Sequence, residues 1–83
     1  MTISDEVHLR HLTVDEALIK LDEYIHSAYM AGLNNVRIVH GKGTGTLRVM
    51  VDRELARHPL VSKYRRGGRG EGGAGVTVVE LAG

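Results

Sequence analysis

The segment that most constrains the fold is a β-branched run that leads at once into a glycine-rich turn. Residues 36–40 read VRIVH, which is typical of a buried strand, and glycines follow at positions 41, 43 and 45. Apolar residues at helical spacing then predict a helix over residues 46–57. A strand, a turn in which the backbone can approach a neighbour closely, and a helix therefore follow one another directly. This succession is typical of α/β proteins.

A similar unit comes earlier in the chain. Residues 6–10 alternate polar and apolar side chains, which is the period of a half-buried strand. Thr13 and Glu16 have the spacing of a capping box that begins a helix, and Gly32 is placed to end it in the left-handed conformation. The apolar stripe between these two signals predicts an amphipathic helix that packs on the sheet.

Two more strands complete the pattern. Residues 61–65 follow Pro59, which cannot continue the second helix, and the apolar residues 76–81 suit the centre of a sheet. A glycine-rich loop over residues 67–75 joins them. We therefore predict an α/β fold, a two-layer βαβαββ sandwich with a four-stranded mixed sheet and both helices on one face. Each helix should cross over between parallel neighbours, and the last two strands should form a broad hairpin.

The directions of several polar side chains follow from this arrangement. By alternation, Glu6, His8, Arg10 and Arg37 should point to the sheet face that no helix covers. Asp52 should lie on the solvent side of the second helix, so that its replacement by alanine should matter little.

Length and composition limit the class of protein. Eighty-three residues suit a single domain over residues 1–83. The chain has no cysteine, which excludes disulfides, cysteine zinc sites, thiol nucleophiles and iron–sulfur clusters. No apolar run approaches the ~20 residues of a membrane span, so we expect no membrane association and a cytoplasmic location.

The charge distribution is uneven along the chain. Residues 1–35 carry two basic against six acidic side chains, a balance of −4, whereas residues 36–83 carry nine against four, a balance of +5. Such a split favours a polyanionic partner at one face or edge. The alternative is that the basic side chains merely solvate a helix and a loop.

The glycine-rich turn is the first candidate site. Gly41 and Gly43 allow close approach of a ligand, and the unpaired N–H groups of the following helix carry the positive end of its dipole. Lys42 and Arg48 add charge, which predicts a phosphate site. The glycine spacing fits neither a Walker loop nor a dinucleotide fingerprint. The alternative is that the glycines serve only a tight turn.

Histidines and a second basic segment extend the candidate site. His40 could act as a general acid or base, or as a further phosphate contact. A three-histidine metal cluster of His8, His11 and His40 is an alternative. A basic edge could clamp a phosphate backbone, and with the glycine turn would form one nucleic-acid-binding surface. Its members are Lys63, Arg65, Arg66 and Arg69.

Three segments together resemble the small MutS-related (Smr) domain. They read HGKGTGTLR at residues 40–48, HPLV at residues 58–61 and EGGAGVTVVEL at residues 71–81. The resemblance runs from about residue 7 to residue 81 and is closest to the version at the C-terminus of the second bacterial MutS paralogue. It implies a sandwich similar to the C-terminal domain of translation initiation factor three. It also implies nicking of DNA, cleavage of RNA in some relatives, and roles in DNA repair, recombination control or rescue of collided ribosomes.

The same resemblance implies the partners of the domain. They are DNA or RNA, including the RNA of the ribosome, and the remainder of a MutS-like ATPase. The chain would then be a single Smr-like domain excised from the C-terminus of a larger protein.

The first strand departs from the family pattern. The family usually reads L-D-L-[HR]-G there, whereas residues 7–11 read VHLRH. The resemblance implies catalytic roles for Arg10 and His40, with His8 in place of the family aspartate and His11 in place of the glycine. Neutral histidine is a poor ligand for magnesium, so we predict weak, metal-independent cleavage or none. A divalent cation, a non-catalytic binding module and a protein-interaction domain on the uncovered sheet face stay as alternatives.

Overall fold

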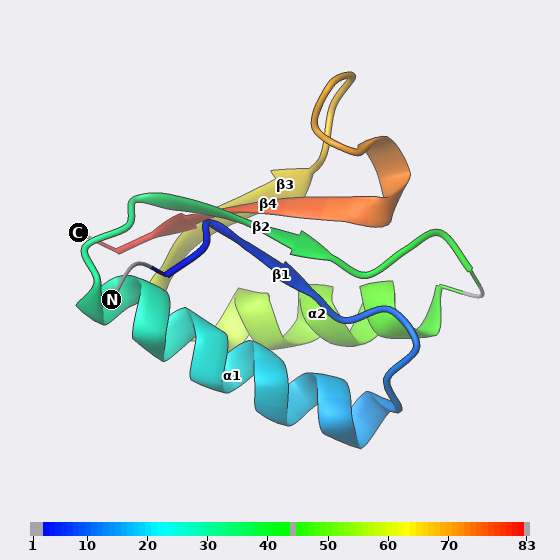
Figure 1. Ribbon diagram of the computed structural model, residues 1–83, viewed down its shortest axis with the longest axis horizontal. Helices are drawn as coiled ribbons and strands as arrows, with labels where there is room; N and C mark the ends of the chain where they lie inside the picture. Colours follow the sequence, from blue (N-terminus) through cyan, green and yellow to red (C-terminus); the bar gives the residue numbers. More distant parts are fainter. Residues whose placement is uncertain (1–2, 44, 83) are drawn as a thin grey trace.

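The computed structural model describes residues 3–43 and 45–82. Its elements are β1 (Glu6–His8), α1 (Val14–Met30), β2 (Asn35–Val39), α2 (Thr46–Arg57), β3 (Val61–Arg66) and β4 (Val76–Leu81), with a short 3₁₀ turn at Gly73–Gly75. Figure 1 shows one sheet above a layer formed by α1 and α2. The two-layer α/β prediction, with both helices on one face, is therefore confirmed.

The strand order of the sheet is β1-β2-β4-β3. β1 and β2 are parallel, and β4 is antiparallel to both β2 and β3. The prediction of parallel neighbours is thus confirmed for the first strand–helix unit and wrong for the second, because β4 lies between β2 and β3. The composition explains this order. β4 is almost entirely buried or half-buried, whereas residues 62–65 of β3 are exposed and suit an edge.

The ends of α1 lie where the sequence signals placed them. The backbone N–H of Glu16 donates to Thr13 Oγ1 at 3.2 Å, and the N–H of Thr13 donates to Glu16 Oε1 at 2.9 Å, so the capping box is complete. Gly32 has a φ of 81° just beyond the helix, as predicted. β1 is shorter than predicted. Beyond it, Leu9 N–H still donates to Val39 O at 2.8 Å, but the chain then turns at His11, whose φ is 69°.

The hydrophobic core lies between the sheet and the helix layer. Fully buried side chains from α1, α2 and the strands form it, including Leu9, Leu21, Ile25, Ile38, Val51, Leu55 and Val79. Within the described residues, no helix is long and apolar enough to span a bilayer.

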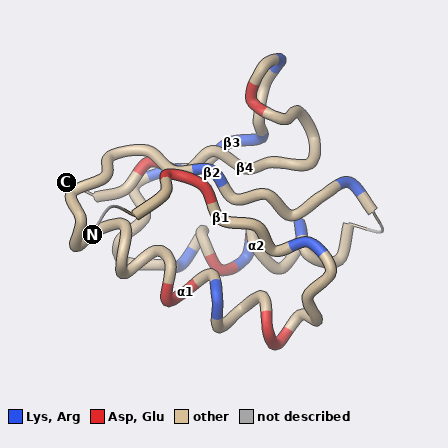
Figure 2. Tube along the Cα trace, in the orientation of Figure 1, with Lys and Arg blue, Asp and Glu red and all other residues tan. Residues whose placement is uncertain are grey.

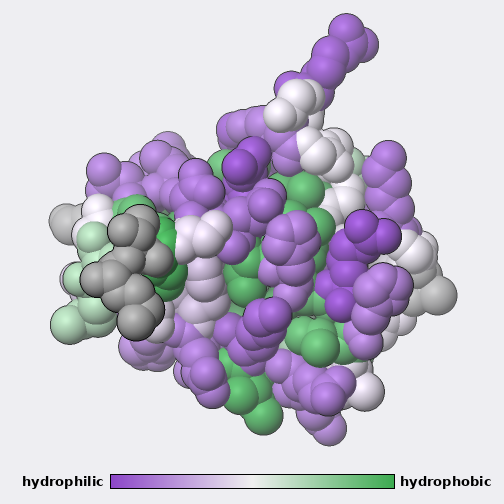
Figure 3. All heavy atoms as spheres, in the orientation of Figure 1, coloured by the Kyte–Doolittle hydropathy of each residue, from purple (hydrophilic) through white to green (hydrophobic). Residues whose placement is uncertain are grey.

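The other face of the sheet is polar, as alternation predicted. A groove of about 480 Å³ on this face is lined by Glu6, His8, Arg10 and Arg37, among others. Figure 3 views the molecule from the side of β1 and α1, where hydrophobic residues appear as separate areas among hydrophilic ones. This side of the described residues therefore offers no broad apolar surface for a protein partner.

Candidate nucleic-acid interface

The glycine turn is held to the start of β4. The backbone N–H groups of His40 and Gly41 both donate to the carbonyl oxygen of Gly75, at 3.0 Å each. Gly41 and Gly45 have φ values of 83° and 85°, a region that other residues enter only with strain. Glycine at these two positions therefore lets the turn take this path without strain before α2 begins at Thr46.

The side chain of Arg10 lies against this turn. A Cβ atom added to Gly41 would stand 3.3 Å from Arg10 Cγ and 3.5 Å from Arg10 Nε. Gly41 thus leaves the space that the arginine occupies. On the helix side of the sheet, a cleft of about 450 Å³ opens beside these two residues. We call it the turn cleft. Its lining comprises Arg10, His11, Leu12, Thr13, Val14, His40, Gly41, Gly43, Gly45, Thr46, Leu47 and Arg48.

His40 lies at the inner end of the turn cleft and is only 4% exposed. A carbonyl oxygen can only accept, so Nδ1–H of the neutral ring donates to Gly41 O at 2.9 Å. Nε2 is then the acceptor and receives the Thr77 hydroxyl at 2.9 Å. Burial, aided by the nearby Arg66 and Arg48 charges, lowers the pKa of His40. The ring is therefore neutral at pH 7, and both its nitrogens are engaged.

A chain of polar contacts continues from His40 to α2. Arg66 Nη1 donates to Thr77 Oγ1 at 3.0 Å and lies 3.5 Å from His40 Nε2, and Arg66 Nη2 donates to Asp52 Oδ2 at 2.8 Å. The expectation that Asp52 merely faces solvent is wrong. One of its oxygens holds Arg66, and the other is buried without a hydrogen-bond partner among the described residues. Asp52 therefore anchors the arginine that borders His40.

Three of the four members of the predicted basic edge on β3 are paired with acidic side chains. Lys63 pairs with Glu80 at 3.7 Å, and Arg65 makes two bonds of 2.8 and 2.9 Å to Glu71. Arg66 turns to the helix side, as described above. Of the four predicted members, only Arg69 has no acidic partner in the described part of the chain. Three of the four charges are therefore paired with acids, and the joint phosphate clamp stays a prediction.

Other cations are concentrated near the glycine turn. Five of the eleven lysines and arginines form ion pairs within residues 3–43 and 45–82, namely Arg37, Arg57, Lys63, Arg65 and Arg66. Of the remaining six, Arg10, Lys42, Arg48 and Arg53 line hollows at the glycine turn or at the start of α2. Figure 2 shows basic segments at the end of β1 and in the turn before α2, and acidic segments on β1 and α1 as well as on α2 and in the loop between β3 and β4.

The predicted histidine cluster does not form. His8 lies on the open sheet face, where its Nε2 is 3.1 Å from Glu6 Oε2, and His40 lies on the helix side. The two side chains are therefore separated by the sheet itself. Arg10 borders the hollows on both faces. Of the three residues that the resemblance implied as catalytic, Arg10 borders both hollows, His40 lines the turn cleft, and His8 lines the groove of the open face together with Gly41 and Lys42 of the turn.

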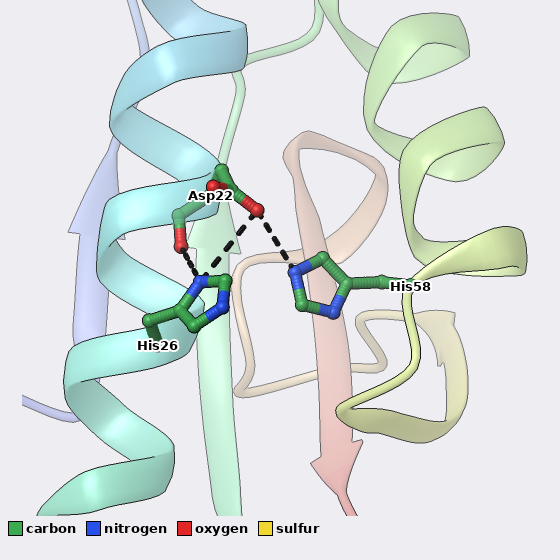
Figure 4. A group of neighbouring side chains, drawn as sticks. All are labelled: Asp22, His26 and His58. Atoms are coloured by element: carbon green, nitrogen blue, oxygen red, sulfur yellow. Dashed lines mark hydrogen bonds and ion pairs between the residues drawn. The ribbon is translucent and has the colours of Figure 1, made fainter.

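A different group of metal-type donors does come together. Within the described residues, ligand atoms of Asp22, His26 and His58 lie within 4.8 Å of one another, between α1 and the end of α2 (Figure 4). The backbone N–H of Leu60 donates to His58 Nδ1 at 3.1 Å, so the neutral ring carries its proton on Nε2 and donates it to Asp22 Oδ1 at 3.0 Å. A metal on Nε2 would place the proton on Nδ1, facing the Leu60 N–H. The three side chains are therefore suited to linking α1 to the end of α2 by hydrogen bonds, and not to binding a cation.

Sequence reasoning named His11 only as a metal ligand or as the replacement of a family glycine, and it missed two other residues of the site. His11 is exposed in the turn cleft and has a φ of 69°, a conformation that favours glycine. Thr77 and Asp52 hold the surroundings of His40. The alternation of side chains between the two faces of a strand could have predicted one further feature of the site. His8 falls with the polar residues of its strand, and His40 with the buried Val36 and Ile38, so opposite faces could have been predicted.

The fold and the cleft define a small α/β domain with a basic, glycine-lined site at the end of its sheet. Residues 7–82 match the family model of the Smr domain, and the chain belongs to this family. The match confirms the resemblance that the sequence motifs indicated.

Several known proteins are similar to the chain. Proteins named Endonuclease MutS2 from Pelotomaculum thermopropionicum and Clostridium beijerinckii are each 54% identical to it, over 96% and 98% of its length. The chain spans 10% of the length of these relatives. The crystal structure of the Smr domain of Thermus thermophilus MutS2 is 46% identical, with a TM-score of 0.91 over 94% of this chain and 98% of that one. YdaL, a stand-alone small MutS-related protein from Escherichia coli, is 30% identical, with a TM-score of 0.88 over 93% of this chain and 63% of that one.

Proposed function

We propose that the domain binds the phosphate backbone of DNA or RNA in the turn cleft. One observation carries this proposal: the cleft contains Arg10 and Arg48 and no acidic side chain among its described lining residues. Neither arginine has an ion-pair partner within residues 3–43 and 45–82. A concave, positive and uncompensated site attracts a polyanion most strongly.

The backbone at the start of α2 supports the same reading. No acidic residue lies in the first turn of the helix, and its N-cap Gly45 has no side chain to cap the N–H groups. The positive end of the helix dipole therefore faces the cleft without a competing carboxylate. Lys42 lies on the other side of the turn, in the groove of the open sheet face, and can reach a phosphate next to the one in the cleft.

Binding should be measured with fluorescent oligonucleotides over a series of salt concentrations. A Lys42→Ala, Arg48→Ala double variant should bind more weakly, and the slope of log affinity against log salt should decrease by about 0.7–0.9 for each lost phosphate contact. Lys63→Ala, Arg57→Ala is the matched control, because it removes the same charge from ion-paired positions. Equal effects of the two double variants would contradict the proposal.

Phosphodiester cleavage is a second candidate function, favoured by the exposed imidazole of His11 in the same cleft as Arg10 and Arg48. Imidazole is well suited to exchange protons near neutral pH, and the arginines could stabilise charge on the phosphate. The relatives named as endonucleases support this candidate. We expect the cleavage to be weak and independent of divalent metal, because no carboxylate lines the described part of the cleft.

A nicking assay on supercoiled plasmid and structured RNA, with magnesium and with a chelator, tests cleavage. His11→Ala should abolish nicking, whereas His8→Ala, on the opposite face of the sheet, should leave it unchanged. Cleavage that requires His8 and magnesium would place the chemistry on the open sheet face instead.

The proposal includes a wider setting. We propose that the domain acts as part of a longer MutS-like chain in the cytoplasm, where it brings the other parts to nucleic acid. The length of the MutS2 relatives supports this proposal. Crosslinking of the full protein to nucleic acid should then depend on Arg48.

A further inference from the structure

The hollows on the two faces of the sheet differ in charge. On the open face, the groove beside His8 contains Glu6 and Glu71, and a second hollow beside β3 contains Glu80. On the helix side, the turn cleft contains no acid, and neither does a neighbouring hollow of about 460 Å³. The lining of this neighbour comprises Val14, Gly45, Thr46, Arg48, Val49, Met50 and Arg53.

The two hollows on the helix side are adjacent. Val14, Gly45, Thr46 and Arg48 line both of them, so a ligand in the turn cleft that continues along α2 would enter the second hollow. We call the second hollow the α2 track. It passes between the start of α1 and the first two turns of α2.

The charges of the α2 track are uncompensated. Arg53 has no acidic partner within the described residues, in the same way as Arg48. Arg57, one helical turn further on, forms an ion pair with Glu54 and does not line the track. The unpaired positive charges on α2 therefore end where the track ends. Unpaired positive charges along the track favour an anionic polymer that continues beyond the turn cleft. A peptide or a small anion would use fewer of them.

The walls of the track are apolar and partly open to solvent. Val49 is 50% exposed and Val14 is 39% exposed, and Met50 lies beside them. A duplex presents mainly phosphates and sugars to such a hollow, because its bases are stacked and paired. An unpaired strand can turn the apolar faces of its bases to these side chains while its phosphates meet the arginines.

We infer that the α2 track binds a single-stranded segment of the nucleic acid whose phosphate occupies the turn cleft. Arg48 and Arg53 bind successive phosphates of this segment, and Val14 and Val49 contact its bases. The inference rests on the proposed function of the turn cleft and adds to it a direction along the protein and a preference for unpaired nucleotides.

The test uses labelled single-stranded oligonucleotides and the matching duplex, with equilibrium binding measured across salt. Arg53→Ala should weaken binding of the single strand severalfold and reduce its salt slope by about 0.7, whereas Arg57→Ala should change neither. Val49→Ser should weaken binding of the single strand and leave duplex binding unchanged. Thermal unfolding of each variant checks that the fold is retained, which is expected because all three side chains are exposed.

Two results would overturn the inference. One is an equal effect of Arg53→Ala and Arg57→Ala, and the other is an equal loss of single-strand and duplex binding in Val49→Ser. If binding then still depends on Lys42 and Arg48, the track is excluded while the proposed function of the turn cleft stands. If the unmodified chain binds neither probe, the proposed function itself fails, and the inference fails with it.

Discussion

Arg10 occupies the space that a side chain at Gly41 would need: a Cβ on Gly41 would lie 3.3 Å from Arg10 Cγ. Gly41→Ala should therefore displace the arginine, and its φ of 83° adds a cost on the order of 1–2 kcal/mol. We expect a lower free energy of unfolding together with weaker nucleic-acid binding. Denaturant unfolding and binding titrations measure the two effects.

Gly43 is the matched control for this prediction. A Cβ there meets no described atom within 4 Å, and its φ is not in the left-handed region. Gly43→Ala should leave stability unchanged or increase it by about 0.4–1 kcal/mol. Equal destabilisation by the two alanines would show that strain at Gly41 is not the cause.

His11→Gly should stabilise the domain. His11 has a φ of 69°, in a conformation that costs most residues about 1–2 kcal/mol. Glycine removes this strain but gives the unfolded chain more freedom, so we expect a net gain of about 0.5–1 kcal/mol in the free energy of unfolding. His11→Ala removes the imidazole as well but keeps the strain, and it should give no gain. An equal gain in stability in both variants would show that loss of the imidazole ring, and not relief of backbone strain, is the cause.

Protonation of His40 should weaken the fold in mild acid. Burial lowers the pKa of His40 below its ordinary value of 6.5, so the unfolded chain takes up the proton first as the pH falls. The stability from neutral His40 is present above about pH 6.5 and is lost below it. NMR titration of the imidazole nitrogens measures its pKa directly. In Arg66→Gln that pKa should rise, because the arginine charge contributes to lowering it.

The Arg65–Glu71 pair should govern stability at lower pH. Two hydrogen bonds from Arg65, with one from the Gly68 N–H, lower the pKa of Glu71 to about 2. This contribution to stability is present above about pH 4.5 and is lost between pH 4.5 and 2. Glu71→Gln should flatten the stability profile in this window. Lys63→Gln, from a more exposed pair, should leave the profile unchanged.

The fold could be predicted because its signals are local. The capping box at Thr13, the stop at Gly32 and the β-branched runs depend on neighbours in the sequence, and the structure confirms each of them. The position of β4 between β2 and β3 depends instead on a comparison of whole strands, because β4 is more apolar than β3 over its length. The apolar residues of β4 did predict a place at the centre of the sheet. The rule that a crossover joins parallel neighbours nevertheless led to the wrong prediction that β2 and β3 are adjacent.

The site was harder to predict because it depends on pairing across the fold. Whether Arg65 and Arg66 are available to a ligand is decided by Glu71 in the loop and by Asp52 on α2, which no spacing along β3 reveals. The same limit applies to the helix link of Asp22 and His58, which lie 36 positions apart in sequence.

The separation of paired from unpaired cations has a consequence for how the domain meets its target. With a net charge of only +1, the molecule as a whole is weakly attracted to a polyanion. Four of the six cations that have no acidic partner in the described residues nevertheless lie at the glycine turn or at the start of α2, while acids outnumber basic residues on α1, so the domain has an electric dipole. In the field of a nucleic acid such a dipole turns the molecule before contact. The domain should therefore arrive with its cleft already facing the strand. Its association rate should fall as added salt screens the electrostatic force that orients it.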